Sequence, residues 1–107
     1  MDTSQVLPAC PVGIYDKQPG DTQDYDVDFS PWLQGLSDQI QTYTVTTSPG
    51  ITKNSDSMFP GNTKIKAWIS GGKAGNTYKV TYRITTVGIG GFKRIKEAEL
   101  LIRVVQC

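Results

Sequence analysis

The stretch Ile65–Val87, IKAWISGGKAGNTYKVTYRITTV, decides the fold of this chain. Apolar residues occupy every second position before a glycine-rich break at 71–75, and the same alternation resumes after the break. These alternating residues are Ile65, Ala67, Ile69, Tyr78, Val80, Tyr82 and Ile84. A period of two is typical of antiparallel strands that have one buried face and one solvent-exposed face. The stretch therefore predicts a β-hairpin and, with it, a small all-β domain.

Four other segments predict strands around this hairpin, and they cover residues 24–29, 40–47, 51–58 and 92–105. Ser30-Pro31 ends the first of them because proline cannot donate to a strand ladder. Trp32 and Leu33 are expected to fold back as a hydrophobic plug. Six or seven short strands separated by turns are typical of a β-sandwich. The predicted fold is all-β, an immunoglobulin-like antiparallel β-sandwich of about seven strands without the Cys-Trp-Cys core of true immunoglobulin domains.

The first 21 residues have neither helical nor strand periodicity, because prolines and glycines interrupt every run. They are nevertheless too apolar for a solvated tail, since they include Val6, Leu7, Ile14 and Tyr15. Residues 1–21 are predicted to form an extended N-terminal arm, and residues 22–107 the β-sandwich domain. The arm packs either on its own domain or on a neighbouring subunit, and the neighbour is the preferred alternative.

The length of 107 residues is that of one domain. No apolar run approaches the roughly 20 residues that span a bilayer. The first residues also lack the basic flank and apolar stretch of a secretory signal. Synthesis in the cytoplasm without membrane insertion is therefore expected.

Charge is distributed unevenly along the chain, although the net charge is only +1. Residues 1–60 carry eight Asp against two Lys, and residues 61–107 carry nine Lys or Arg against two Glu. This polarity can join copies head to tail, or it can be neutralised between strands of one fold. Nucleic-acid binding is not expected, because the basic residues alternate along strands instead of forming a dense cluster.

No catalytic, cofactor or metal site is predicted. The chain contains no histidine, so it has neither an imidazole base nor a catalytic triad. The glycine clusters at 71–75 and 88–91 lack the pattern of a phosphate-binding loop. Asp24, Asp26 and Asp28 could suggest calcium, but the glycine and glutamate of an EF-hand are missing, and on a strand the three carboxylates share the solvent face.

The two cysteines, Cys10 and Cys107, lie near opposite ends of the chain. A disulfide between them would close nearly the whole chain as a loop. Two free thiols are the preferred alternative, because nothing in the sequence suggests export.

Two stretches carry a family resemblance. DYDVDFSPWL at 24–33 is similar to an acidic, aromatic strand followed by Asp-Trp-Ser-x-Trp-Leu, with Phe29 in place of the first tryptophan. WISGGKAGNTYKVTYRITT at 68–86 is similar to Trp-Leu-Ser-Gly-Gly-x-Ala-Gly-x-x-Tyr-x-Val-x-x-Arg-Ile-Thr-Thr. Both patterns resemble those of a family of small bacteriophage virion proteins, the fiber–tail adaptor proteins, and the likeness covers roughly residues 17–105.

The resemblance implies a non-enzymatic structural subunit of a virion, located in the tail or neck and assembled in the host cytoplasm. Several copies in a ring would join a tail fiber or spike to the tail adaptor or tube, without nucleic acid, membrane or cofactor. Residues 1–16 and the VGIGGFKR segment at 87–94 depart from the family pattern. These two regions supply the candidate interface residues Val6, Leu7, Ile14, Tyr15, Phe92, Lys93 and Arg94.

Two other functions stay open. A capsid decoration or cement protein is the first, since immunoglobulin-like domains also coat capsids. A carbohydrate-binding module is the second, with Trp32, Tyr43, Trp68 and Tyr82 as stacking platforms. Trp68 shares the strand face of Lys64 and Lys66, so it is either an exposed interface anchor or part of the interior if that face turns inward.

Overall fold

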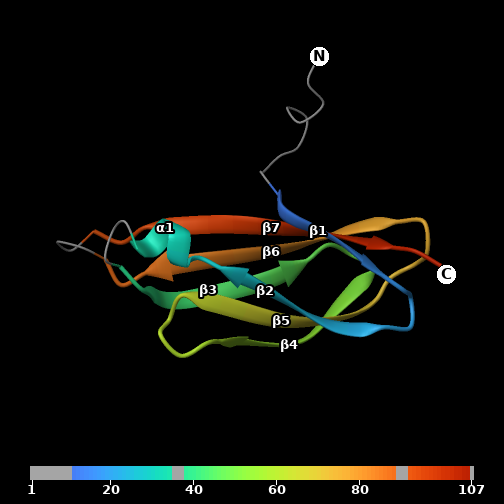
Figure 1. Cartoon of the computed structure of the whole chain (residues 1–107), viewed down its shortest axis with the longest axis horizontal. Helices are drawn as coiled ribbons and strands as arrows, with labels where there is room; N and C mark the ends of the chain where they lie inside the picture. The colour runs from blue at the N-terminus through green and yellow to red at the C-terminus, as the bar shows by residue number, and fades with distance from the viewer. Residues whose placement is uncertain (1–10, 35–37, 89–91, 107) are drawn as a thin grey trace, which may run out of the picture.

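The computed structural model describes residues 11–34, 38–88 and 92–106, and these residues form two packed β-sheets (Figure 1). The strands are β1 (Pro11–Lys17), β2 (Thr22–Asp28), β3 (Ile40–Thr47), β4 (Ile51–Met58), β5 (Lys64–Gly71), β6 (Thr77–Thr86) and β7 (Ile95–Val104). One sheet has the order β1-β7-β6-β3 and the other the order β2-β5-β4. The predicted all-β sandwich is confirmed, while its immunoglobulin-like character stays a prediction.

Each strand expected from the sequence is present, with ends shifted by a few residues. The predicted β-hairpin is wrong, because β5 pairs with β2 and β4 in one sheet, whereas β6 pairs with β3 and β7 in the other. The glycine-rich turn at 71–75 therefore crosses between the sheets, and the buried faces of β5 and β6 both line the core. The last strand begins at Ile95 instead of residue 92. The plug after β2 is the helical turn α1 (Ser30–Gln34). Leu33 in this turn is buried with 1% exposure, and Trp32 is partly buried against the core.

Residues 11–17 differ from the expected arm, because they form edge strand β1 of the four-stranded sheet. β1 pairs with β7 in parallel, whereas the other strand pairs described are antiparallel, so this sheet is mixed. The free edge of β7 offers main-chain partners to these residues. In addition, Arg103 on β7 donates from Nε and Nη2 to the two carboxylate oxygens of Asp16, at 2.8 and 3.0 Å. Val6, Leu7, Cys10 and Cys107 lie outside the described residues.

The core lies between the sheets and is built from the alternating residues of β5 in one sheet and β6 in the other. Ile65, Ala67, Ile69, Val80, Tyr82 and Ile84 are all fully buried. The hydroxyl of Tyr82 on β6 donates to the main-chain carbonyl of Tyr25 on β2, at 2.7 Å. This buried hydrogen bond joins the two sheets.

Lys17 at the end of β1 is buried, with 2% exposure. Its ammonium group donates to the carbonyls of Gln18 and Gly71 at 2.8 and 2.6 Å, and Gly71 ends β5 in the opposite sheet. Burial lowers the pKa of the Lys17 ammonium group, because removal from water penalises its charged form. Its hydrogen bonds to carbonyl dipoles offset part of that cost. Lys17 therefore ties β1 to the second sheet.

Asp38 holds the start of β3 against the end of β6. The main-chain N–H groups of Gln39 and Gly88 donate to Asp38 Oδ1 at 2.8 and 3.1 Å. Burial alone raises the pKa of this carboxyl group, but the hydrogen bonds from Gln39, Gly88 and Thr86 outweigh burial, so the pKa lies below its usual value. Folding is therefore coupled to ionisation of Asp38.

We expect Asp38→Asn to destabilise the domain and to flatten its response to acid. A carboxyl group whose pKa is lowered by folding stabilises the fold above its unfolded pKa of about 4. This contribution is lost as the pH falls through the lower, folded pKa. Urea unfolding at a series of pH values from neutral to acidic would measure it. Asp26→Asn, at an exposed position on β2, is the control. An acid response of Asp38→Asn as steep as that of the native chain would contradict the assignment.

Candidate interaction surface

The candidate residues on β1 point to opposite sides of its sheet. Ile14 is 62% exposed. Tyr15 is 42% exposed, and its ring lies 5.3 Å from that of Tyr25 in the other sheet. Tyr15 thus bridges the edges of the two sheets, while Ile14 is free to contact another molecule.

The second group of candidate residues precedes β7. Phe92 is 78% exposed, the highest value among the exposed large hydrophobic residues of the described chain. Lys93 and Arg94 are exposed as well. The Lys93 ammonium donates to Gln41 Oε1 at 2.6 Å, and the Arg94 main-chain N–H donates to Thr86 Oγ1 at 2.9 Å. These bonds fasten the segment to β3 and β6 and leave the Phe92 ring exposed.

The structure does not bring the two groups together. Ile14 lies opposite Leu101 of β7, seven residues beyond Arg94. At about 3.3 Å per strand residue, the groups are roughly 20 Å apart along the sheet. The predicted interface therefore consists of two separate exposed sites.

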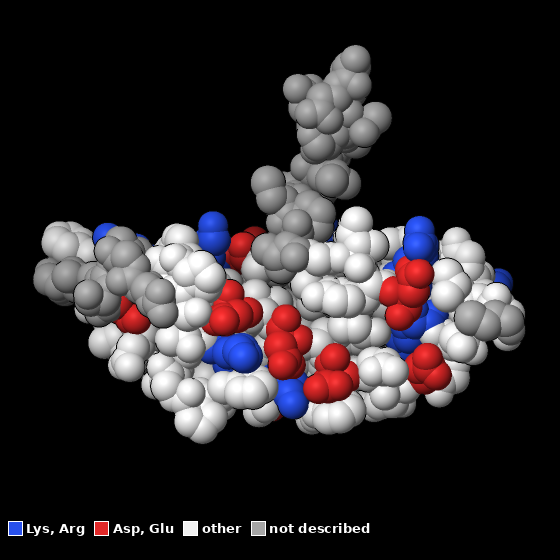
Figure 2. Space-filling model, viewed as in Figure 1, with Lys and Arg blue, Asp and Glu red and all other residues white. Residues whose placement is uncertain are grey.

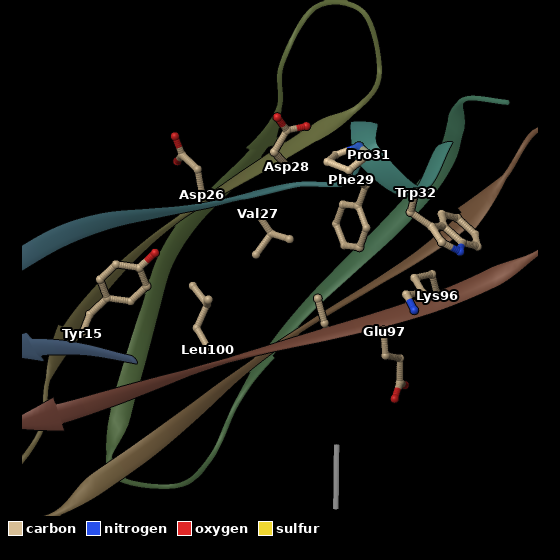
Figure 3. A pocket seen from close by; sticks show the side chains of 11 residues that line it. Tyr15, Asp26, Val27, Asp28, Phe29, Pro31, Trp32, Lys96, Glu97 and Leu100 are labelled. Atoms are coloured by element: carbon tan, nitrogen blue, oxygen red, sulfur yellow. The ribbon is translucent and has the colours of Figure 1, made fainter. Parts of the chain in front are cut away.

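A groove of about 490 Å³ lies between β2 and the first half of β7, with Tyr15 at one end and Trp32 at the other (Figure 3). Val27, Phe29 and Leu100 point into it, whereas Asp26 and Asp28 point away from it at its rim. Val27, Phe29 and Leu100 are each less than 6% exposed, so the floor of the groove is formed by core residues. It is an apolar slot with a charged rim.

No pattern in the sequence indicates this groove. Lys96 closes one end of it, with its ammonium group 5.7 Å from the centre of the Trp32 ring. The apolar alternation of β2 and β7 was visible in the sequence. The sequence did not show that these two strands face each other, because they are far apart along the chain and lie in different sheets.

Charges of the two halves of the chain meet within the fold. Asp16 pairs with Arg103, and Asp24 lies 3.3 Å from the Lys66 ammonium group. On the face seen in Figure 2, acidic and basic side chains are interspersed and do not form a patch of one sign. Neutralisation within the fold therefore accounts for part of the charge polarity of the sequence.

The four aromatic candidates for sugar stacking are in different environments. Tyr82 is fully buried and Tyr43 is partly buried in the core cluster, whereas Trp68 is 39% exposed. The Lys66 ammonium group lies 5.9 Å from the centre of the Trp68 ring. Of the two alternatives for Trp68, the structure shows the exposed one, and burial removes Tyr82 as a stacking platform.

Within the described ranges, no cluster of three or more metal-ligating side chains is arranged to hold an ion. No helix there is long and apolar enough to cross a membrane. The described surface offers a groove, exposed side chains and strand edges. These features define a domain of the β-sandwich class whose groove and exposed side chains are available to other molecules.

The comparison with protein families specifies that class. The family described as "Podophage GP4 fiber-tail adaptor protein gp77" matches residues 17–103. This range covers most of the 107 residues, so the chain belongs to this family. The family's name indicates a structural adaptor role in a phage particle, with other tail or fiber proteins as partners. No curated protein matches the chain.

Proposed function

We propose that this chain is a non-enzymatic tail adaptor that joins a fiber or spike to the tail or neck of the virion, in several copies arranged as a ring. Its family membership over residues 17–103 is the observation that carries the proposal. The fold suits the role, because two sheets closed over one core give a rigid block whose surfaces are available to neighbours.

The candidate interface residues have different tasks in this proposal. Phe92, Lys93 and Arg94 form an exposed apolar and basic site that suits a fiber or tail partner, since exposed aromatic and arginine side chains are enriched in protein interfaces. Ile14 and Tyr15 belong to β1, so only residues 1–10 remain as an arm that can reach a neighbouring copy. Val6 and Leu7 are its apolar anchors.

Particles assembled without the chain are expected to carry tails that lack fibers or spikes. Resupplying the native chain should restore them, and quantitative mass spectrometry of purified particles should count a few to a dozen copies each. Hundreds of copies, together with fibers that attach without the chain, would contradict the proposal and favour a decoration protein of the capsid.

A further inference from the structure

The groove is bordered by strand edges that no described residue occupies. β7 pairs with β6 along its whole length, but its pairing with β1 begins only at Glu99, opposite Pro11. Residues 95–98 of β7 therefore pair on one side only within the described chain. β2, across the groove, is the outermost strand of its sheet. An unpaired strand edge is a template for a strand from another chain.

The side chains in the groove restrict what can enter it. Its floor is apolar, so it suits an apolar side chain better than a charged one. The part of β7 that borders the groove is as long as a short strand. Four residues, 95–98, extend about 13 Å at roughly 3.3 Å per residue.

Two prolines disfavour a fully regular continuation of β1 along this edge. In a strand, main-chain N–H groups point alternately to the two sides, and proline has no N–H. Pro8 and Pro11 are three residues apart, so one of them would face β7 at a position that requires a donor. A continuous ladder through both prolines would therefore lack one donor, and the described pairing of β1 with β7 begins at Pro11.

Residues 1–7, MDTSQVL, are the part of the arm that can form a regular strand. They contain no proline and end in two aliphatic residues, Val6 and Leu7. Fully extended they span about 23 Å, which exceeds the open edge of β7. The segment from Pro8 to Pro11 then remains as an extended connection between one subunit and the next.

We propose that residues 1–7 of a second copy add as a strand to residues 95–98 of β7 and place an aliphatic side chain in the groove. The inference rests on the proposed multi-copy adaptor and specifies how adjacent copies are joined. Each subunit gives its N-terminal segment to one neighbour and accepts the segment of another. Such a head-to-tail contact closes into a ring when the rotation between copies allows it.

Photo-crosslinking tests this contact in the full chain. The chain carrying p-benzoylphenylalanine in place of Leu7 is mixed with ¹⁵N-labelled native chain at high concentration and irradiated. A second sample uses assembled particles. We expect crosslinks between unlabelled and labelled copies, located by mass spectrometry in residues 95–100 or 26–32. The same reporter in place of Ile14, which lies on the outer face of β1, should leave these two peptides unlabelled.

The outcomes that contradict this contact can be distinguished from those that contradict the proposed function. Crosslinks that stay within one chain, that fall outside the groove, or that do not form in either sample would overturn the inference. If particles still require the chain for fiber attachment in those cases, the proposed function stands without this contact. If the expected crosslinks are absent and fibers also attach without the chain, the proposed function is contradicted as well.

A matched pair of variants gives a second measurement. The double variant Val6→Asp/Leu7→Asp should lower incorporation into particles at least tenfold while the melting midpoint of the isolated chain stays unchanged. Val6→Ile/Leu7→Met keeps the apolar character and should incorporate normally. A lower melting midpoint in the aspartate variant would show that the segment packs on its own domain, and normal incorporation of that variant would also overturn the inference.

Discussion

Gly72→Ala is expected to destabilise the domain by about 2–5 kcal/mol, because the new methyl group has no space and the backbone is left-handed there. Gly72 has φ = +99° in the turn between β5 and β6. A Cβ at this position would lie 2.6 Å from Val104 Cγ2 and 3.2 Å from Tyr78 Cε2. The loss should appear as a lower midpoint in urea unfolding, with an unchanged slope.

Gly75 in the same turn is the matched control. Its φ of +93° is equally left-handed, but an added Cβ would meet no atom within 4 Å. Gly75→Ala should therefore cost only the backbone strain, about 1–2 kcal/mol. Equal losses in the two variants would show that the turn closes over the core without the tight packing described for Gly72.

Tyr82→Phe is expected to cost about 1–3 kcal/mol, because it removes the hydrogen bond that joins the sheets and leaves a buried carbonyl without its donor. The ring of Tyr82 is fully buried, so phenylalanine preserves the packing. Burial raises the pKa of the Tyr82 hydroxyl, which therefore stays protonated as a donor to Tyr25. Thermal and urea unfolding would both measure the loss.

Tyr25→Phe is the control for this bond. The Tyr25 hydroxyl is buried and has no hydrogen-bond partner in the described part of the structure. Removing a buried, unpaired hydroxyl should leave stability unchanged or raise it slightly. The main-chain carbonyl that accepts from Tyr82 is retained in this variant. If both phenylalanine variants lost the same stability, the hydrogen bond between the sheets could not be the cause.

The buried faces of β5 and β6 could be predicted from the sequence, because alternation is a local property. Their pairing as a hairpin could not, since each strand pairs with other strands in its own sheet. Ile65, Ala67 and Ile69 are buried as the pattern requires, while the intervening Trp68 is exposed. The same holds for β2, where Tyr25 and Val27 are buried and the aspartates between them face solvent. In each case successive side chains point to opposite faces, so one contiguous stretch is sufficient for the prediction.

β1 could not be predicted in this way. Residues 11–17 lack a regular apolar pattern, and their partners on β7 lie more than 80 residues later in the chain. Asp16 and Lys17 show why the segment is ordered, since their charges meet Arg103 and the carbonyl of Gly71. These contacts depend on distant residues that no local pattern reveals.

The candidate interface residues could be selected from the sequence, but their arrangement in space could not. The departures from the family pattern supplied the candidate interface residues, and their role as an interface stays a prediction. Of these residues, Ile14 and Phe92 are exposed. Their separation along β7 was not visible in the sequence. The groove was not visible in the sequence either, because its walls belong to β2 and β7, which lie in different sheets.

By itself, the sequence determined the class of fold, the strands β5 and β6 and the family, because each depends on residues that are close together in the chain. Only the tertiary structure decided that residues 11–17 join the sheet, that β5 and β6 lie in different sheets, and that β2 faces β7 across an apolar slot. It also showed that, among the described residues, positions 95–98 of β7 pair with β6 alone. The physical reason is that strand edges and grooves arise from pairing and packing between distant segments. Residue periodicity reports only which side of a strand is buried.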